Sequence, residues 1–306
     1  YSENNLFDID NELREAYPNA RIETELADVK DRVRLQMVFS RSQPQVVFHA
    51  AAHKHVPMME KHPAEAVKNN ILGTRNIAEM ADKFGAETFI LISTDKAVNP
   101  TSVMGATKRI AEMLIQDLNQ NSPASFAAVR FGNVLGSRGS VIPTFKKQIE
   151  KGGPVTVTHP DMTRYFMTIP EAVQLVIEAG AMARGGEIFV LDMGEPVKIT
   201  DLAQDLIRLH GYEPDKDIKI TFTGIRPGEK LYEELFSSRE QMAATMHDRI
   251  YISNKEQDLY FSSLETIDTL FAKNAFINRN DVVELISQVL PEYRTTKREA
   301  QVRIEV

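Results

Sequence analysis

The sequence predicts an α/β protein built on a doubly wound, mainly parallel sheet. The first observation is a set of three short apolar runs without polar alternation, at residues 46–48, 88–93 and 126–131. Such runs indicate strands buried on both faces. The second observation is that longer segments with apolar residues at helical spacing separate the runs. Strands that alternate with helices form right-handed βαβ units, and hence a sheet covered on both faces.

Two helices are predicted between the three strands. The first spans residues 64–84 and ends before Gly85; its apolar face carries Val67, Ile71, Ile77, Met80 and Ala81. The second spans residues 103–118, and its apolar face carries Ile110, Met113, Leu114 and Leu118. A single apolar face on each helix is expected when a helix packs on a sheet.

The second half of the chain predicts a smaller and more mixed part. Helices are expected at 144–150, 170–183, 199–209, 264–273 and 281–290, and strands at 187–191 and 218–223. No segment has the composition of a flexible linker, so the two parts are expected to interleave. The predicted boundaries are 1–135 with 164–193 for the larger domain, 136–163 with 194–290 for the smaller domain, and 291–306 for a charged tail.

Composition and charge exclude several classes of protein and site. The chain of 306 residues has no cysteine, which excludes disulfides and thiolate metal sites and suits a cytoplasmic protein. Its net charge of −7 argues against a partner with a phosphate backbone, so no nucleic acid is expected. No apolar run approaches the roughly 20 residues that span a bilayer, and no signal peptide opens the chain.

The glycine-rich turn of a dinucleotide-binding fold, G-x-G-x-x-G, is missing from the chain. Residues 1–6 lead directly into a helical stretch, which is the arrangement that follows the second strand of a Rossmann unit. We therefore expect a Rossmann-like sheet that lacks its first βα unit, with roughly 30 or more residues upstream.

Small residues and two histidines follow the strand at 46–48. The alanines at 50–52 would let a cofactor approach the backbone, because ligands of open α/β sheets bind at the carboxyl ends of the strands. The same alanines also suit a tight turn that only packs. His53 and His55 lie close together, but no acidic residue lies at ligand spacing, so no metal site is predicted.

A second polar group ends the strand at 88–93 and therefore lies on the same edge of the sheet. Asp95 and Lys96 are adjacent, and a carboxylate beside an amine can act as acid and base. Taken alone, the pair is equally a surface ion pair worth about 0–1 kcal/mol. Lys108, near the start of the helix at 103–118, would point at a cofactor ribose if that helix lines the same crevice, and into solvent otherwise.

Several motifs together resemble a known family. They are HAAAHKHVPMME at 49–60, NNILGT at 69–74, STDKAVNPTSVMGATKR at 93–109, RFGNVLGSRGSV at 130–141, MTRYF at 162–166 and RPGEK at 226–230. In order and spacing they are similar to extended short-chain dehydrogenase/reductases, and within these to the polysaccharide-biosynthesis group of UDP-N-acetylglucosamine 4,6-dehydratases. The resemblance covers roughly residues 1–240. It implies a larger domain that binds a dinucleotide and a smaller domain that binds the nucleotide sugar.

Two positions are distinctive within this resemblance. Most short-chain dehydrogenases carry Tyr-x-x-x-Lys, whereas here Met104 holds the tyrosine position and has no proton to exchange. The larger, membrane-tethered members of the group share this Met-x-x-x-Lys pattern, so any membrane contact is expected on the cytoplasmic face, through a segment upstream. Lys96 lies where related dTDP-glucose dehydratases have glutamate, which favours the UDP-N-acetylglucosamine group.

The resemblance implies a reaction in which a hydride moves from C4 of the sugar to NAD or NADP, water is eliminated across C5 and C6, and the hydride returns to C6. It assigns Lys96 as the base at C5 and Asp95 as the acid at C6. Thr94 would orient the C4 oxygen, and Lys108 would hold the ribose. A base must be neutral, so burial or a nearby cation is expected to depress the pKa of Lys96. Lys108 acting through a water is the hypothesis for the acceptor of the C4 proton.

The resemblance also implies binding positions for both ligands. The cofactor positions are Asp28, Val29, Ala50, Ala51, Asn70, Ser93 and Lys108. The UDP-sugar positions are Asn133, Arg138, Gly139, Ser140, Val141, Arg164, Arg226 and Glu229. Arg164 and Arg226 are expected to clamp the diphosphate, because a forked guanidinium matches two oxygens at once. The protein is expected to form a homo-oligomer.

Two other functions stay open. A UDP-sugar 4-epimerase on the same scaffold needs a tyrosine-type base and no acid–base pair at C5 and C6, so Met104 and the Asp95–Lys96 pair argue against it. A regulatory module that binds the cofactor without catalysis would explain Met104 as decay, but it would not need Asp95, Lys96 and Lys108 together. The choice between NAD and NADP also stays open.

Overall fold

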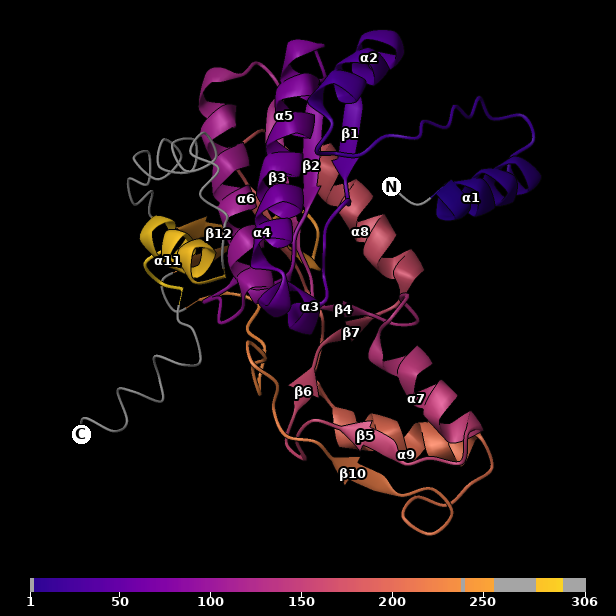
Figure 1. The fold of residues 1–306 in the computed structure, drawn as a ribbon. Helices are drawn as coiled ribbons and strands as arrows, with labels where there is room; N and C mark the ends of the chain where they lie inside the picture. The colour runs from indigo at the N-terminus through magenta and orange to yellow at the C-terminus, as the bar shows by residue number, and fades with distance from the viewer. Residues whose placement is uncertain (1–2, 238–239, 256–278, 294–306) are drawn as a thin grey trace.

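The computed structural model describes residues 3–237, 240–255 and 279–293 of the chain. Its central sheet has six strands in the order β1-β2-β3-β8-β12-β11 (Figure 1). They span Val46–His49 (β1), Thr88–Ile92 (β2), Ser125–Arg130 (β3), Ile188–Leu191 (β8), Glu240–Ala244 (β11) and Ile250–Lys255 (β12). The first four are parallel neighbours, whereas β12 runs antiparallel to β8 and β11. The predicted α/β fold with a mainly parallel sheet is therefore confirmed.

The central strands send alternate side chains into two separate apolar cores. In β2, Phe89 and Leu91 pack into the core on one face, while Ile90 packs into the core on the other. In β3, Phe126 packs into the first of these cores and Val129 into the second. Because successive side chains of a strand point to opposite faces, two apolar cores require apolar residues at every position, which explains the unbroken apolar runs.

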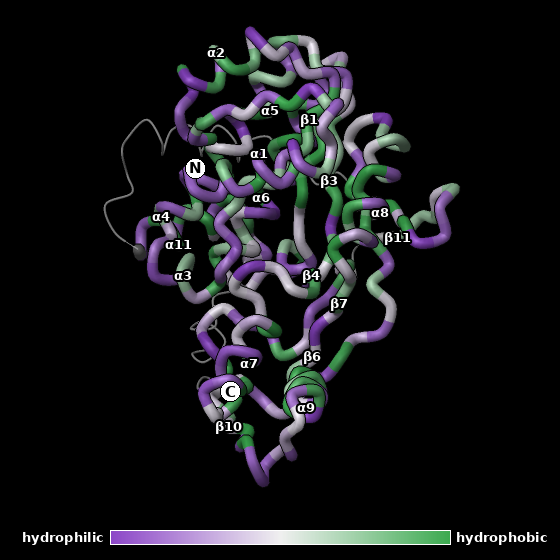
Figure 2. The backbone as a smooth tube through the Cα atoms, turned by 90° about the vertical axis from the view of Figure 1, so that its right-hand side faces the viewer, coloured by the Kyte–Doolittle hydropathy of each residue, from purple (hydrophilic) through white to green (hydrophobic). Residues whose placement is uncertain are grey.

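Helices cover both faces of the sheet (Figure 1). They span Glu3–Ala16 (α1), Arg32–Ser42 (α2), Val56–Lys61 (α3), Pro63–Ala66 (α4), Gly73–Lys83 (α5), Val103–Asn121 (α6), Val141–Glu150 (α7), Ile169–Met182 (α8), Ile199–Leu209 (α9) and Arg279–Val289 (α11). α2, α5, α6 and α11 contribute to the core on one face, and α8 packs on the other. Figure 2 shows green, apolar segments along α8. Among the described helices, none is both long and apolar enough to span a bilayer.

The helix predicted at 64–84 is present but is not a uniform α-helix. A π-helical segment, Val67–Leu72, joins α4 to α5 without a break. It packs against α6 and buries Asn69 and Asn70. Wide turns of this kind occur mostly at functional sites, and this one aims Asn70 at the loop that follows β1.

A smaller part lies beyond the carboxyl ends of the parallel strands (Figure 1). Its core contains α7, α9 and two short parallel strands, and two more strand pairs lie between it and the sheet. These strands are Asn133–Val134 (β4), Val155–Val157 (β5), Thr163–Arg164 (β6), Phe166–Met167 (β7), Val197–Lys198 (β9) and Ile220–Phe222 (β10). The chain enters this part after β3 and again after β8, so the two parts interleave as predicted.

The C-terminal elements differ from the predicted domain boundary. β11 and β12 join the six-stranded sheet, and α11 packs beside α4 and α6, although the sequence predicted 194–290 in the smaller domain. The hairpin was missed because only Ile250 and Ile252 of β12 pack on this core and Ser253, Asn254 and Lys255 follow them, so no long apolar run marks it. The helix predicted at 264–273 and most of the tail predicted at 291–306 lie outside the described residues.

Candidate active site

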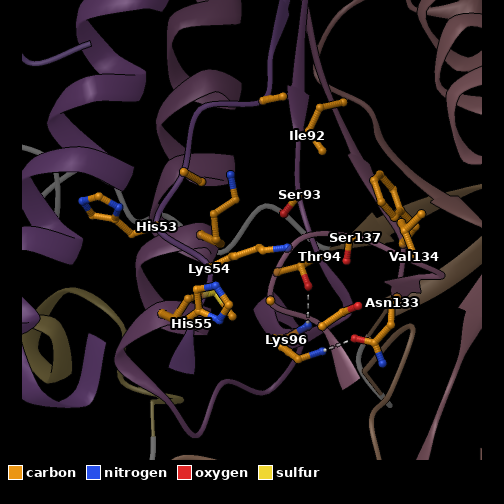
Figure 3. A pocket seen from close by; sticks show the side chains of 18 residues that line it. His53, Lys54, His55, Ile92, Ser93, Thr94, Lys96, Asn133, Val134 and Ser137 are labelled. Atoms are coloured by element: carbon orange, nitrogen blue, oxygen red, sulfur yellow. Dashed lines mark hydrogen bonds between the residues drawn. The ribbon is translucent and has the colours of Figure 1, made fainter. Parts of the chain in front are cut away.

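A cavity of about 350 Å³ lies at the carboxyl ends of β1, β2 and β3, and we call it the large cavity. Loops leaving parallel strands diverge at this edge, which is why ligands of doubly wound sheets bind there. Figure 3 shows Lys54 and His55 on one side, Asn133 on the other, and Thr94 and Lys96 between them. The lining consists of Ala50, Ala52, His53, Lys54, His55, Ile92, Ser93, Thr94, Lys96, Met104, Lys108, Phe131, Gly132, Asn133, Val134, Ser137, Gly139 and Ser140.

A short 3₁₀ turn shortly after β2, Asp95–Ala97, carries the predicted acid–base pair, Asp95 and Lys96. Asp95 is fully buried, and its Oδ1 accepts hydrogen bonds from Thr94 Oγ1 at 2.8 Å and from Lys96 Nζ at 3.0 Å. Its Oδ2 is buried without a hydrogen-bond partner in the described structure. Leaving a buried carboxylate oxygen unpaired is costly, and Asp95 meets the large cavity through Thr94 and Lys96, which line it.

Lys96 lies between two carboxylates, and the charge of the nearby Arg164 opposes their effect without reversing it. The Lys96 Nζ is 3.0 Å from Asp95 Oδ1 and 3.5 Å from Glu233 Oε1. Burial by itself lowers the pKa of Lys96, but the charges of Asp95 and Glu233 outweigh burial and raise this pKa above its ordinary value. The expectation of a depressed pKa is therefore wrong for this arrangement. It rested on the need for a neutral base and overlooked the carboxylates on either side.

The geometry still allows Lys96 to act as a base. The 3.0 Å hydrogen bond joins its Nζ to a carboxylate, so one proton transfer turns the ammonium and the carboxylate into a neutral amine and a carboxylic acid. The charge of the pair and its number of protons stay the same. The ion pair therefore already contains the one proton that an acid–base pair needs.

α6 brings Met104 and Lys108 to the same cavity. Both are buried, and they lie four residues apart, so they share one face of the helix. Burial lowers the pKa of Lys108 to about 8, against the opposing charge of Glu112. Its Nζ makes no hydrogen bond to any of the described residues, so this amine is available to a ligand. Met104 contributes an apolar thioether at the position of the family's tyrosine.

Gly105 sets the close approach of α6 to the turn that carries Lys96. A Cβ at this position would lie 2.1 Å from the backbone oxygen of Lys96, far inside the van der Waals distance. Ser102 caps the helix at the same point, accepting a hydrogen bond from the Gly105 N–H at 3.0 Å. Only glycine therefore lets Lys108 and Lys96 line one cavity.

Gly105→Ala is expected to push α6 away from the 3₁₀ turn and to cost at least tenfold in activity, with a loss of roughly 1–3 kcal/mol in stability from overpacking. Gly180→Ala in α8 is the matched control, because its Cβ would meet its nearest neighbour at an ordinary 3.4 Å. Turnover and urea denaturation of both variants check the prediction. Equal activity of the two variants would contradict it.

A buried ion cluster lies beneath the cavity. Glu112 accepts hydrogen bonds from Arg130 Nε and Nη2, both at 2.7 Å, and from Arg109 Nη1 at 2.9 Å. Ser93, at the end of β2, donates to the same carboxylate at 2.6 Å. The hydrogen bond to Glu112 therefore fixes the Ser93 hydroxyl. The cluster also links β2 and β3 to α6.

Asn70 does not line the large cavity but holds the backbone of a segment that does. Its Oδ1 accepts from the His53 N–H at 2.8 Å, and its Nδ2 donates to the His53 carbonyl and to Thr107 Oγ1, both at 3.0 Å. These bonds use both amide hydrogens. Asn70 thus holds the loop after β1 against α6, which shapes the wall formed by Ala50, Ala52 and His53.

The remaining predicted cofactor residues lie outside the lining of the large cavity. Asp28 and Val29 belong to the loop before α2, where Asp28 Oδ1 accepts from the Lys30 N–H at 2.9 Å. The side chain of Val29 packs over Gly73, where a Cβ would lie 2.5 Å from its Cγ2. Ala51 is exposed and, unlike Ala50 and Ala52, does not line the cavity.

Three predicted substrate residues line the large cavity together with Lys96. Asn133 Oδ1 lies 3.5 Å from Lys96 Nζ (Figure 3). Gly139 has a φ of +71° and lies under the His55 ring, where a Cβ would be 2.7 Å from Cε1. Ser140 Oγ is buried without a partner among the described residues. By contrast, the exposed Arg138 bonds Asn5 of α1, and Val141 begins α7.

Arg164 and Arg226 do not form a shared clamp. The guanidinium of Arg164 is buried and donates to the carbonyls of residues 163, 230 and 231, at 2.6, 2.8 and 3.2 Å. Arg226 is exposed and pairs with Glu229 at 2.9 Å. The sequence shows that both arginines stand at motif positions. It does not show that the guanidinium of Arg164 is already bonded to backbone carbonyls. Arg226 alone is open to a diphosphate.

Sequence reasoning missed Glu233, Lys54 and His55. Glu233 is buried next to Lys96, but it stands in a run LYEELF whose pattern does not tell which of its two glutamates points inward. Lys54 and His55 line the large cavity, and burial lowers the pKa of each, helped for His55 by the charge of Lys54. Their position directly after the strand end at His49 was the available signal.

Comparisons with known proteins show the family of the chain. A family model described as "Polysaccharide biosynthesis protein" matches residues 1–255. The chain is 62% identical over 253 residues to the probable polysaccharide biosynthesis protein EpsC of Bacillus subtilis, and it spans 42% of the length of that protein. The structure of Pen from Bacillus thuringiensis matches with a TM-score of 0.74 at 36% identity, covering 84% of this chain and 79% of that one.

Relatives with named activities fall into two groups. A UDP-N-acetylglucosamine 4,6-dehydratase (inverting) of Campylobacter jejuni is 40% identical over 70% of this chain and 62% of its own. A UDP-glucose 4-epimerase of Rickettsia canadensis is 41% identical over 65% of this chain and 58% of its own. The sequence identities to these two relatives are nearly equal, so sequence identity does not decide between the two activities. With its family model covering most of the chain and its sheet of the short-chain dehydrogenase type, this chain belongs to the polysaccharide biosynthesis protein family.

Proposed function

We propose that the chain is the catalytic part of a nucleotide-sugar 4,6-dehydratase that converts UDP-N-acetylglucosamine to a UDP-4-keto-6-deoxy sugar, for surface polysaccharide biosynthesis. The observation that carries the proposal is that Lys96 and Lys108 line one cavity, while Lys96 is bonded to the buried Asp95, whose second carboxylate oxygen has no partner among the described residues. A dehydratase needs an acid and a base close together at neighbouring carbons, and an epimerase does not.

The residues of the cavity fit a nicotinamide cofactor. Ala50 leaves room beside the backbone, the Ser93 hydroxyl is fixed by Glu112, and the buried amine of Lys108 has no hydrogen-bond partner among the described residues. Such a cofactor, NAD or NADP, would accept a hydride from C4 and return it to C6. We propose that Lys108 holds its ribose and that the loop formed by Asp28 and Val29 contacts its adenine side. Ala51 and Asn70 would support the loop against which the cofactor packs.

At C4, we propose that Lys108 accepts the hydroxyl proton through a water. Its lowered pKa of about 8 makes the neutral amine accessible near neutral pH. Thr94 would orient the C4 oxygen, since its hydroxyl is fixed by the 2.8 Å bond to Asp95 Oδ1. Met104, with no proton to exchange, would only close the apolar wall of the cavity.

At C5 and C6, the acid–base pair would complete one full proton cycle. Lys96 passes its proton to Asp95 and then takes the C5 proton, and the electrons of the C5–H bond form the C5–C6 double bond. As the C6–O bond breaks, Asp95 gives its proton to the departing oxygen, which leaves as water. The pair returns to an ammonium and a carboxylate, and Lys96 can later return a proton to C5.

The substrate would extend from this pair toward the smaller part. Asn133, Gly139 and Ser140 line the large cavity near Lys96 and are proposed to contact the sugar and the adjacent phosphate. Arg138, Val141 and Glu229 are proposed to shape the path of the nucleotide. Arg226 is proposed as the diphosphate contact, whereas Arg164 is proposed to hold the chain at residues 230 and 231.

Arg226→Ala is expected to weaken UDP binding by about 2 kcal/mol, or roughly thirtyfold in Kd, because a charge-assisted contact to phosphate is lost. Arg208→Ala is the control, since Arg208 is an exposed arginine of α9 paired with Asp205. Calorimetry with UDP measures both. Equal UDP affinity of the Arg226 variant and the control would remove Arg226 from the site.

The rate of cofactor reduction in the first step is expected to rise with pH through about 8. Below this pH Lys108 is charged, because its lowered pKa is still about 8, and a charged amine cannot take the C4 proton. Rapid-mixing absorbance of the reduced nicotinamide measures the step. A Lys108→Met variant should lose the signal at every pH, whereas an unchanged pH profile in this variant would assign the C4 proton to another group.

Two alternative functions can be distinguished from the dehydratase by one experiment. A 4-epimerase would use the same cofactor without losing water, and a regulatory module would bind it without turnover; the buried acid–base pair favours neither. The whole protein is incubated with UDP-N-acetylglucosamine and NAD or NADP, and the product is followed by mass spectrometry and NMR. Loss of one water with a 4-ketone supports the dehydratase. A C4 epimer of unchanged mass indicates the epimerase, and nucleotide binding without any product indicates the module.

A further inference from the structure

Lys96 faces a second, smaller cavity in addition to the large one. This small cavity has a volume of about 90 Å³ and is lined in part by Lys96, Thr101, Arg164, Glu229, Lys230 and Glu233. Asp95 and Asn133, the other two groups in contact with the Lys96 amine, do not line it. The small cavity therefore reaches the amine from a direction separate from the sugar.

Glu233 joins Lys96 to the small cavity. Its side chain is only 3% exposed, and its Oε1 lies 3.5 Å from Lys96 Nζ and 3.7 Å from Arg164 Nε. Its Oε2 is buried and has no hydrogen-bond partner in the described structure. The guanidinium of Arg164 is held by three backbone carbonyls, so it fixes the Glu233 carboxylate without being able to take a proton from it.

The small cavity has the size and the polarity to hold water. Its 90 Å³ corresponds to about three water volumes of roughly 30 Å³ each. Polar side chains line it, and Thr101, Glu229 and Lys230 are half-buried, so they connect it toward the surface. A water in the cavity would satisfy Glu233 Oε2, because a buried unpaired carboxylate oxygen is otherwise costly.

We propose that Glu233 and the water of the small cavity form a proton relay that exchanges the protons of Lys96 with solvent while the sugar fills the large cavity. Glu233 is in this sense a positioning residue, since it acts on the sugar only through Lys96. The inference rests on the proposed dehydratase activity. It adds that the proton returned to C5 comes from solvent through Glu233.

Each step of the relay balances. After the C5 proton is taken, Lys96 carries three protons, one of which came from the sugar. Glu233 Oε1 accepts one of the three and becomes a carboxylic acid; the carboxyl group then turns about its Cγ–Cδ bond, so that this O–H reaches a water of the small cavity and gives it the same proton. The reverse sequence returns a solvent proton to Lys96. The Asp95 carboxylate cannot replace this route, because it is fully buried and lies outside the small cavity.

The test uses UDP-N-acetylglucosamine deuterated at C5 and the whole protein in ordinary water. The reaction is quenched within one turnover, and the deuterium at C5 of the product is measured by NMR. The wild-type protein is expected to retain almost none. Glu233→Gln is expected to retain up to about one third, because the deuterium then stays among the three protons of the Lys96 ammonium. This fraction does not depend on the rate, so a merely structural loss of activity would not change it.

Glu234→Gln is the matched control. Glu234 is next in sequence and equally charged, but it is half-exposed and accepts from Lys230 at 3.0 Å, away from Lys96. Its product should lose the deuterium as the wild type does. Glu233→Asp keeps a carboxylate at a greater distance and should retain an intermediate fraction, and it carries the test if the glutamine variant does not fold.

Two outcomes would overturn the relay without touching the proposed function. One is equal loss of deuterium in the Glu233→Gln variant and the wild type, which would mean that solvent reaches Lys96 by another path. The other is full retention of deuterium by the wild type. Failure of the wild type to form any 4-keto-6-deoxy product is a different result, because it would refute the dehydratase proposal itself.

Discussion

Replacing Lys96 with alanine in the whole protein is expected to stop the elimination of water while oxidation at C4 continues. The amine that takes the C5 proton is lost, whereas Lys108 and Thr94 remain. Loss of a general base typically lowers the rate by about 10²–10⁴. Reduced nicotinamide and a 4-keto sugar that still carries its C6 hydroxyl should therefore accumulate. Absorbance of the reduced cofactor and mass spectrometry of the sugar measure both.

Three variants sharpen this experiment. Asp95→Asn should slow the same stage, since the amide has no proton to give to the departing oxygen. Lys108→Ala should instead prevent the first step, so that no reduced cofactor appears. Lys147→Ala removes an exposed lysine of α7 far along the chain and should behave as the wild type. Near-normal dehydration by the Lys96 variant would reduce the Asp95–Lys96 pair to a structural ion pair.

The part of the site that the sequence predicted well is the part carried by regular elements. β2 ends at Ile92 and the acid–base pair follows in the next turn, so an apolar run with a polar end was sufficient to locate it. Met104 and Lys108 lie four residues apart on a helix whose apolar pattern was clear. Parallel strands place such ends at one edge of the sheet, which is why two separate motifs could be brought to one cavity.

The part that the sequence did not predict depends on contacts between distant segments. Glu233 meets Lys96 across 137 positions of the chain, and its charge adds to the larger effect of Asp95 in reversing the expected direction of the Lys96 pKa. Arg164 is used by the backbone at residues 230 and 231, a role that no side-chain motif signals. Both facts follow from how the 226–237 segment folds back on the turn after β2. No local periodicity encodes that approach.

In the buried cluster at Glu112 one carboxylate faces two cations, whereas at Lys96 one cation faces two carboxylates. Here one carboxylate serves two arginines that are themselves almost fully buried, Arg109 and Arg130. Such a cluster contributes little net stability relative to an apolar core, but removing one partner leaves buried charge uncompensated. Since Ser93 belongs to the same cluster, the cluster also determines how firmly the floor of the large cavity is held.

Glu112→Gln is accordingly expected to lower the free energy of unfolding by about 3–5 kcal/mol at neutral pH, because two buried guanidinium groups lose their counter-charge. Glu79→Gln is the matched control: Glu79 also pairs with two arginines, Arg75 and Arg32, but at the surface, where such pairs are worth about 0–1 kcal/mol. Urea denaturation of both variants measures the difference. Similar losses in the two variants would show that burial of the Glu112 cluster is not what makes it stabilising.

The pH dependence of stability gives an independent measure of the same cluster. Burial by itself raises the pKa of Glu112, but Arg130, Arg109 and Ser93 outweigh it and lower this pKa from 4.5 to about 2. A depressed carboxyl pKa stabilises the folded state above the unfolded value, and that contribution is lost as the pH falls from about 4.5 to about 2. The difference of 2.5 units corresponds to roughly 3 kcal/mol, in line with the loss expected from the variant. Glu112→Gln should therefore lose stability less steeply than the wild type in this window, and parallel acid denaturation curves for the two proteins would place the depressed carboxyl elsewhere.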